Sequence, residues 1–442
     1  MQNMKKQLSF ILGFIFLAVS QAHAVLTIEI TQGVEGAAPI AIVPFAWAGK
    51  DAPPEYMNKI IAADLQRSGF FKALPEEDMI AMPSEAGKVN LADWRALKVD
   101  YVVVGKIISQ PDGAFQVQFQ LLDVYKGKQL AGYSIRSRKP NLRTTAHQIS
   151  DIIYRTITGV QGAFDTHIAY ITVTENRKGT KLYRLAIADS DGANEQIVYE
   201  STRPLMSPSW APDGRRLAYV TFFSGRPEIQ VQNILTRETQ KISGFKGING
   251  APAWSPDGRR MALTLSKDGN PEIYVVDLKS KKFTRITRHY AIDTEAAWMP
   301  DGNALIFTSD RGGSPQLYRV ELNSQGAATG RPRRLTFDGN YNSRASISPD
   351  GRRVAMVHRE KGKFQIAVLE LKTGRFQILT DSRLDESPSF SPNGSMIIYA
   401  TEDNYRGILA AVSVDGRAHQ RLSLQMGDVR EPAWSPFKGA VQ

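Results

Sequence analysis

The chain has 442 residues, of which 42% are hydrophobic and 22% charged, a composition typical of globular proteins and unlike that of disordered or multi-spanning membrane proteins. It contains no cysteine, which excludes disulfides, cysteine nucleophiles and thiolate metal sites. The formal net charge is +11, but Lys and Arg are scattered singly or in pairs, so this charge does not indicate nucleic-acid binding.

Residues 1–24 have the pattern of a cleavable secretory signal peptide. Lys5 and Lys6 precede an apolar run, Leu8 to Val19, and an A-x-A cleavage motif ends at Ala24. The run is shorter than the roughly 20 residues that a bilayer-spanning helix requires. An uncleaved anchor is the alternative. We expect an exported, soluble chain that begins near residue 25.

The next segment alternates apolar and polar residues, which is typical of a half-buried strand. Because it lies at a chain end, the strand could be added to another protein's sheet, or it could be the edge strand of its own domain. The residues favour neither, and both could hold in alternate states. The segment comprises Val25, Leu26, Thr27, Ile28, Glu29, Ile30 and Thr31.

Residues 25–160 predict a small α/β domain, because runs of strand type alternate with segments that have helical apolar spacing. A linker is expected at Gly159–Thr166. The predicted elements are a strand at 39–45, a helix from 55 that closes at Gly69, a strand at 99–107, a hairpin at 115–137 and a helix at 144–157.

Residues 161–442 contain a repeat of about 44 residues, marked by an aromatic or apolar residue, a small residue, proline and, in most copies, Asp-Gly. Each unit reads as four short strands, which predicts a six-bladed β-propeller with four-stranded blades. The Asp residues suit tight turns better than catalysis, because copies on four separate corners cannot converge on one substrate. The prolines are Pro212, Pro256, Pro300, Pro349, Pro392 and Pro436.

The last repeat stops after its first strand, and three strand-like segments at 167–173, 181–188 and 195–200 precede the first full repeat. We therefore expect a closing blade that both ends of the propeller share. The residue before each aromatic position is always small. Alternation along the strand then predicts that one face takes small side chains while the other packs a large ring between blades.

Three residues at the start of each first strand differ from repeat to repeat, unlike the scaffold around them. We expect these triplets to ring one mouth of the central channel and to form a binding surface; solvated loop entries are the alternative. The candidates are Met206, Ser207, Asn249, Gly250, Ala251, Asp293, Thr294, Glu295, Ser343, Arg344, Asp385, Glu386, Arg430 and Glu431.

Known catalytic motifs are absent from the sequence: there is no G-x-S-x-G, H-E-x-x-H, P-loop or G-x-G-x-x-G. We expect a non-enzymatic interaction protein without a cofactor or metal. The alternative is an exported propeller hydrolase or lyase that uses channel carboxylates. Acids at the mouth could also hold a cation or receive a basic side chain of a partner.

The segments "NGAPAWSPDGRRMALTLSKDGNPEIYVVDL", "DESPSFSPNGSMIIY", "IAIVPFAWAG" and "TGVQGAF" resemble the TolB family, and the likeness covers essentially the whole chain after residue 24. Asn249-Gly250-Ala251 match an N-G-A-P motif, Thr294-Glu295 a T-E motif and Asp385-Glu386 a D-E-x-P motif. Ile248 departs from the family, in which a histidine often precedes N-G-A-P.

The resemblance implies a periplasmic, monomeric protein of the Tol–Pal system that supports outer-membrane integrity and invagination during cell division. It implies that the lipoprotein Pal binds at the channel mouth and that TolA binds the segment Val25–Thr31. Contacts with other outer-membrane proteins would fit the same role. Binding at the two sites is expected to be reciprocally coupled.

Overall fold

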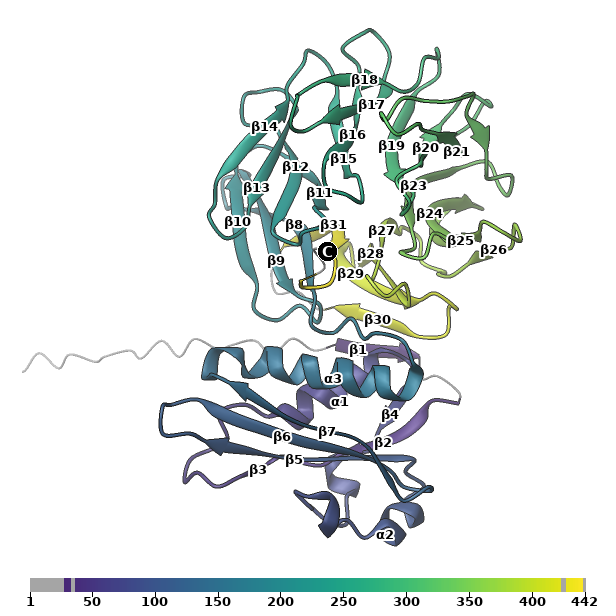
Figure 1. Ribbon diagram of the computed structural model, residues 1–442. Helices are drawn as coiled ribbons and strands as arrows, with labels where there is room; N and C mark the ends of the chain where they lie inside the picture. Colours follow the sequence, from purple (N-terminus) through teal and green to yellow (C-terminus); the bar gives the residue numbers. More distant parts are fainter. Residues whose placement is uncertain (1–27, 33–35, 423–426, 440–442) are drawn as a thin grey trace, which may run out of the picture.

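The computed structural model describes residues 28–32, 36–422 and 427–439, and it divides into an α/β domain and a β-propeller (Figure 1). The expected signal peptide at 1–24 and residues Val25–Thr27 lie outside the described residues. Helices α1 and α3 of the smaller domain lie between its sheet and the propeller.

The α/β domain contains one mixed sheet with the strand order β4-β2-β5-β6-β7, in which β3 also pairs with β5. Its strands are β2 (Ala38–Ile42), β3 (Ala46–Trp47), β4 (Phe71–Ala73), β5 (Tyr101–Ser109), β6 (Phe115–Asp123) and β7 (Lys128–Ser137). Its helices are α1 (Met57–Arg67), α2 (Leu91–Ala96) and α3 (Leu142–Thr158), and 3₁₀ turns lie at Glu76–Asp78, Ala86–Lys88 and Lys139–Asn141.

The long helices form where the apolar spacing predicted them. Ile61 of α1 and Ile149 of α3 belong to one core cluster with Val103 of the sheet, so each helix buries its apolar stripe against the strands. Helix α3 ends at Gly159, which takes the left-handed conformation with φ 76°. The sequence analysis missed β3, β4 and α2, because elements of two to six residues are too short to show a period.

The propeller consists of six blades in the part of the chain that the structure describes, as the repeat predicted. Four blades consist of four consecutive strands each. The first contains β11 (Leu205–Trp210), β12 (Arg216–Thr221), β13 (Glu228–Asn233) and β14 (Thr239–Ser243), and the second contains β15 (Asn249–Trp254), β16 (Arg260–Leu265), β17 (Glu272–Asp277) and β18 (Phe283–Arg285). The third contains β19 (Asp293–Trp298), β20 (Ala304–Ser309), β21 (Gln316–Glu321) and β22 (Arg333–Arg334), and the fourth contains β23 (Asn342–Ile347), β24 (Arg353–Glu360), β25 (Lys363–Glu370) and β26 (Phe376–Ile378).

The closing blade combines both ends of the propeller. Strand β31 (Asp428–Trp434) is its innermost strand and pairs antiparallel with β8 (His167–Glu175), followed by β9 (Lys181–Asp189) and β10 (Gln196–Ser201). The expectation of a shared closing blade is therefore confirmed.

The remaining blade has five strands rather than four. It contains β27 (Glu386–Phe390), β28 (Met396–Asp403), β29 (Arg406–Ser413) and β30 (His419–Leu422), and β1 (Ile28–Gln32) pairs antiparallel with β30 at its outer edge. The described part of the N-terminal segment is thus neither free nor part of the α/β sheet. It extends a propeller blade nearly four hundred residues away in the chain.

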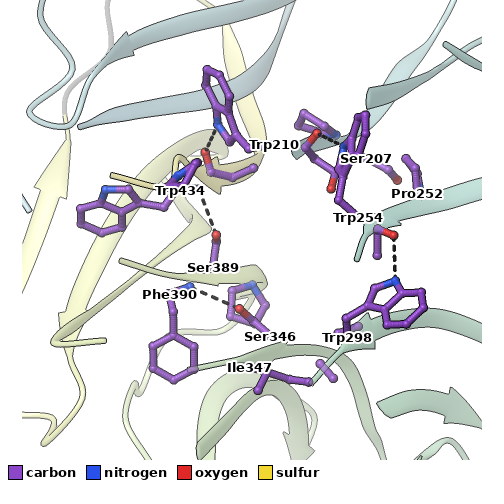
Figure 2. Close-up of a pocket in the computed structure, with 18 of the residues that line it drawn as sticks. Ser207, Trp210, Pro252, Trp254, Trp298, Ser346, Ile347, Ser389, Phe390 and Trp434 are labelled. Carbon is purple, nitrogen blue, oxygen red and sulfur yellow. Dashed lines mark hydrogen bonds between the residues drawn. The ribbon is translucent and has the colours of Figure 1, made fainter. Parts of the chain in front are cut away.

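The blades are joined around the axis by the residues that alternate between large and small. The indole Nε1 of Trp254 donates to the carbonyl of Ser209 in the preceding blade at 3.1 Å, and that of Trp298 donates to Ala253 in the same way at 3.1 Å. The ring of Phe390 has no hydrogen-bond donor. At this position the Ser346 hydroxyl of the preceding blade accepts from the backbone N–H of Phe390 (Figure 2). The prediction that a large ring packs between blades is confirmed, since Trp254 and Trp298 each belong to a core cluster with residues of the preceding blade.

We expect Trp298→Phe to lower the free energy of unfolding by about 1 kcal/mol, because the phenyl ring fills most of the space but leaves the Ala253 carbonyl unpaired. Urea unfolding followed by fluorescence measures this loss. Trp254→Phe removes the same kind of bond and should cost a similar amount. An unchanged urea midpoint in both variants would show that these bonds do not stabilise the ring.

Candidate functional site

The central channel is a cavity of about 570 Å³ whose lining includes residues from the innermost strand of every blade. Each of these strands begins at one mouth and ends in a tight turn at the other. The turn end faces the α/β domain, since Asn393 and Ser395 of one turn line the same cavity as Tyr154 of α3, and Asn393 donates to the carbonyl of Gln161 in the linker at 2.9 Å. The mouth at which the triplets start therefore points away from that contact.

The third residue of each triplet has a left-handed backbone, with φ between 47° and 56°. A register shift, or β-bulge, follows in every blade at this point, for example between Gly250 and Ala253. All six of these residues line the channel, whereas the first and second residues do not. The bulge thus turns one side chain per blade toward the axis. These residues are Ser207, Ala251, Glu295, Arg344, Ser387 and Glu431.

Threonines of the preceding blade bind backbone N–H groups at two of these bulges. The N–H of Glu295 donates to the Thr264 hydroxyl at 3.2 Å, and that of Arg344 donates to the Thr308 hydroxyl at 3.1 Å. None of the six residues is glycine, the residue that adopts positive φ most readily, so the surrounding ring has to hold this conformation.

The first residue of each triplet is buried inside its blade and does not face the mouth. The Asn249 side chain forms hydrogen bonds with the backbone of Phe245, and Asp293 forms an ion pair with Arg311 at 2.7 Å. Burial raises the pKa of Asp385, and a hydrogen bond from Thr380 opposes that rise. These side chains fix the loop that leads into the inner strand. Asn249, Asp293 and Asp385, proposed from the sequence as mouth residues, are thus placed where they shape the mouth from within.

Arg344 is the centre of an ionic network across the channel. Its guanidinium donates to Glu295 at 2.8 Å and to Glu431 at 3.3 Å, and it also bonds the Ser387 hydroxyl. Burial alone would lower the pKa of Arg344, but the carboxylates of Glu431 and Glu295 raise it above its ordinary value. Glu431 further accepts from the backbone N–H of Ser207 at 2.7 Å. The channel acids are therefore already paired with a cation of the protein itself.

An apolar rim surrounds this ionic centre, and the sequence analysis did not include it among the candidates. Ile248, Ile292 and Leu384 each stand immediately before a triplet, and all three are exposed. Leu384 and the 91% exposed Tyr405 border a hollow of about 210 Å³ that also contains Glu386 and Arg430. Aligning the repeats one residue further toward the N-terminus would have found the rim, since this position varies as the triplets do.

The remaining second residues of the triplets differ in accessibility. Met206, Gly250 and Thr294 are partly exposed, whereas Ser343 is buried, so it contributes little surface to the mouth. The mouth thus combines second residues, rim residues and the six channel residues.

The N-terminal candidates lie far from this mouth along the chain and are described only in part. Ile28, Glu29 and Ile30 pair through their backbones with Leu422, Arg421 and Gln420 of β30, and the register shifts between Ile30 and Gln32, where Thr31 lies. Val25, Leu26 and Thr27 lie outside the described residues. The described part of the segment forms a strand, Ile28–Gln32, as the alternation predicted.

Fold and site together define a β-propeller protein with an attached α/β domain and a channel that each blade lines with one turned-in residue. Family models agree: the TolB amino-terminal domain matches residues 26–130, and the TolB beta propeller domain matches residues 154–438. A Tol-Pal system protein TolB from Nitrosococcus oceani is 56% identical over 413 residues, covering 93% of this chain and 94% of that protein. The chain belongs to the TolB family.

Two further comparisons agree with this assignment. A Tol-Pal system protein TolB from Thioalkalivibrio sulfidiphilus is 56% identical over 431 residues, covering 97% of this chain and 98% of that protein. The crystal structure of TolB from Acinetobacter baumannii superposes with a TM-score of 0.85 at 42% identity, covering 93% of this chain and 100% of that one. Within the described ranges, no helix has the length and apolar character needed to cross a membrane.

Arg344→Met should destabilise the chain by about 1–2 kcal/mol, because Glu295 and Glu431 are left facing each other without a counter-ion. The cost is smaller than for a fully buried pair, since the Arg344 side chain is 29% exposed. Urea unfolding of a double-mutant cycle with Glu295→Gln measures the coupling. The double variant should regain part of the lost stability; strictly additive losses would contradict the network.

Proposed function

We propose that the chain is a non-enzymatic periplasmic docking protein of the Tol–Pal system that binds the lipoprotein Pal at the channel mouth. The family relatives named for that system support the system and its compartment. The ring of six turned-in residues supports the mouth as the site, because it gathers unlike side chains from every blade into one surface. In this role the chain supports outer-membrane integrity and invagination of that membrane during division.

The chemistry of the mouth suits protein docking. Partly exposed apolar side chains such as Ile248 and Ile292 stand around a polar centre, and this arrangement of an apolar contact area with fixed hydrogen-bonding groups is common in protein interfaces. Glu386 and Arg430 add charges of both signs beside Tyr405. A partner segment that carries an apolar side chain for the rim and polar groups for the centre would fit.

The same geometry argues against the alternative of a propeller hydrolase or lyase. A general acid or base needs a carboxyl group that reaches substrate, but Glu295 and Glu431 are bonded to Arg344. Asp293 is buried and paired with Arg311. These contacts commit the carboxylates of Glu295, Glu431 and Asp293 to the scaffold.

We propose in addition that the segment Val25–Thr31 contacts TolA. Its support is the strand at Ile28–Gln32, which pairs through its backbone with β30 at the outer edge of a blade. This pairing uses one edge of β1. A partner strand can therefore pair with the other edge of β1, or it can take the place of β30 as the strand to which β1 is bonded. Binding at the mouth and pairing of β1 then bias each other through the propeller they share.

Ile292→Lys should weaken Pal binding at least ten-fold, or about 1.4 kcal/mol, because it places a charge in the apolar rim. Isothermal titration calorimetry with the soluble Pal domain measures the affinity. Leu235→Lys is the matched control, since Leu235 is exposed on a turn between outer strands. Equal affinities of both variants and the parent would exclude the rim from the interface.

Deletion of Val25–Thr31 should abolish TolA binding, because it removes the strand that the partner contacts. A pull-down from envelope extract, with Pal and TolA detected by antibody, compares the full and shortened mature chains. Retained TolA binding would show that another surface carries it. Pal affinity measured in the same pair tests the coupling separately: an unchanged value would rule the coupling out while leaving the Pal site intact.

A further inference from the structure

The two domains meet at a buried cluster of charged side chains. Asp64 and Arg67 of α1 form an ion pair at 3.0 Å, and Arg67 also donates to the Ser190 hydroxyl of the propeller at 2.9 Å. Across the interface, Asp191 in the turn between β9 and β10 pairs with Arg143 of α3. The domains are thus joined by directional polar contacts, which depend on the charge state of each member.

His147 of α3 stands between the two carboxylates of this cluster. Its Nδ1 lies 2.7 Å from Asp64 Oδ2, and its Nε2 lies 3.8 Å from Asp191 Oδ2. The ring is only 2% exposed, and among the described residues Nε2 has no hydrogen-bond partner. Each ring nitrogen therefore faces a carboxylate, one within its own domain and the other across the domain interface.

A neutral imidazole cannot serve both sides. It carries one N–H, so a ring that donates to Asp64 presents a lone pair to Asp191, and two buried acceptors then face each other. An imidazolium carries N–H on both nitrogens and attracts both carboxylates. Burial alone lowers the pKa of His147, but Asp64 and then Asp191 raise it above its ordinary value.

We propose that His147 is a proton-operated latch between the two domains: protonated, it bridges Asp64 of the α/β domain and Asp191 of the propeller, and deprotonated, it releases the cross-domain half of the bridge. The sign follows from linkage. The pairing with Asp64 lies within the α/β domain, whereas Asp191 reaches Nε2 only when the domains dock, so docking favours the charged ring. A charged ring that docking favours stabilises the docked state at low pH, and this contribution is lost as pH rises and the ring loses its proton. The docked state is therefore more stable at low pH than at high pH.

Asp64, His147 and Asp191 lie close enough together to hold a metal cation, but the surrounding residues favour a proton on His147 over a bound metal ion. Asp64 already pairs with Arg67 and Asp191 with Arg143, so a divalent ion would meet two guanidinium groups at short range. The charged and titratable groups that act on His147 are Asp64 and Arg67 on α1, Asp191 in the turn after β9, and His167 on β8. Arg143, Asp189, Asp151 and Asp165 belong to the same cluster through their contacts with these neighbours.

Two of these neighbours titrate in ways that have to be separated from the latch. Burial raises the pKa of Asp151 to about 6, and this carboxylate accepts from the backbone N–H groups of Phe164 and Asp165 in the linker. Because the pKa of Asp151 is also raised, ionisation of this carboxylate above that pKa weakens docking of the linker. Asp151 and His147 therefore both make docking weaker as pH rises. Arg67 and His147 hold the pKa of Asp191 below its ordinary value, against the effect of burial, so Asp191 titrates at much lower pH.

The latch lies next to the strand that carries β1. The Gln420 side chain of β30 donates to the backbone carbonyl of Arg67, and Gln420 is also the backbone partner of Ile30. Release of the domains would therefore free a contact at the blade that holds the N-terminal segment. This inference rests on contacts within the chain and does not depend on either partner.

The absence of cysteine makes a direct test simple. Lys128→Cys and Lys372→Cys place one exposed label in each domain, and solution energy transfer then reports their separation from pH 5 to pH 9. We expect the fraction of undocked molecules to rise with pH. The docking equilibrium constant should change in total by at most about ten-fold for each unit by which the pKa of His147 is higher in the docked state than in the undocked state. Energy transfer that does not change with pH would overturn the proposal.

Three variants assign the effect. His147→Gln keeps a donor for Asp64 but cannot be charged, so it should reduce the pH dependence to the part that Asp151 contributes. Asp191→Asn removes the propeller carboxylate and should reduce the pH dependence in the same way, which gives an independent test if His147→Gln does not fold. Asp151→Asn should retain the response. A parent-like pH response in His147→Gln or in Asp191→Asn, or its loss in Asp151→Asn, would contradict the latch. An NMR titration that places the His147 pKa at or below about 6.5 would also contradict it.

Discussion

The pairing of β31 with β8 is the interaction on which the rest of this structure depends. It joins residues about 260 positions apart in the sequence and turns a row of sheets into a closed ring. Glu431 lies on β31, and from there it reaches the N–H of Ser207 in the first complete blade and the guanidinium of Arg344 across the channel. Without closure these contacts could not form, and the six inner strands would not share one mouth.

Closure also explains which parts of the fold were predictable. The period of about 44 residues fixes four strands per unit, and the unfinished last repeat together with the orphan strands at 167–200 implies a shared blade. Alternation of Trp298 with Ala297 predicts packing between blades because it depends only on strand geometry. Each of these features is local or repeated, so one sequence contains enough copies to reveal it.

The site was less predictable, because its decisive feature is imposed by the ring. The third triplet residues take positive φ although they are Ser, Ala, Glu and Arg, residues that give no local signal for that conformation. The burial of Asp293 and Asp385 depends on partners such as Arg311 and Thr380 elsewhere in the chain. Similarly, alternation predicts a strand at Ile28–Ile30 but cannot name β30 as its partner, since that edge exists only in the assembled blade.

The two ends of the inner strands have different tasks. At the mouth, the bulges turn side chains toward the axis, while at the turn end Asn393 contacts the linker. Trp434, at the turn end of β31, joins the ring to the linker: its backbone N–H donates to Ser389 of the neighbouring blade and its indole donates to Thr166 at the end of the linker, each at 2.9 Å. Movement of the linker relative to the propeller must break the Trp434–Thr166 bond or carry the closing strand with it, and Glu431 lies on that strand. The domain interface and the mouth are therefore mechanically connected through one strand.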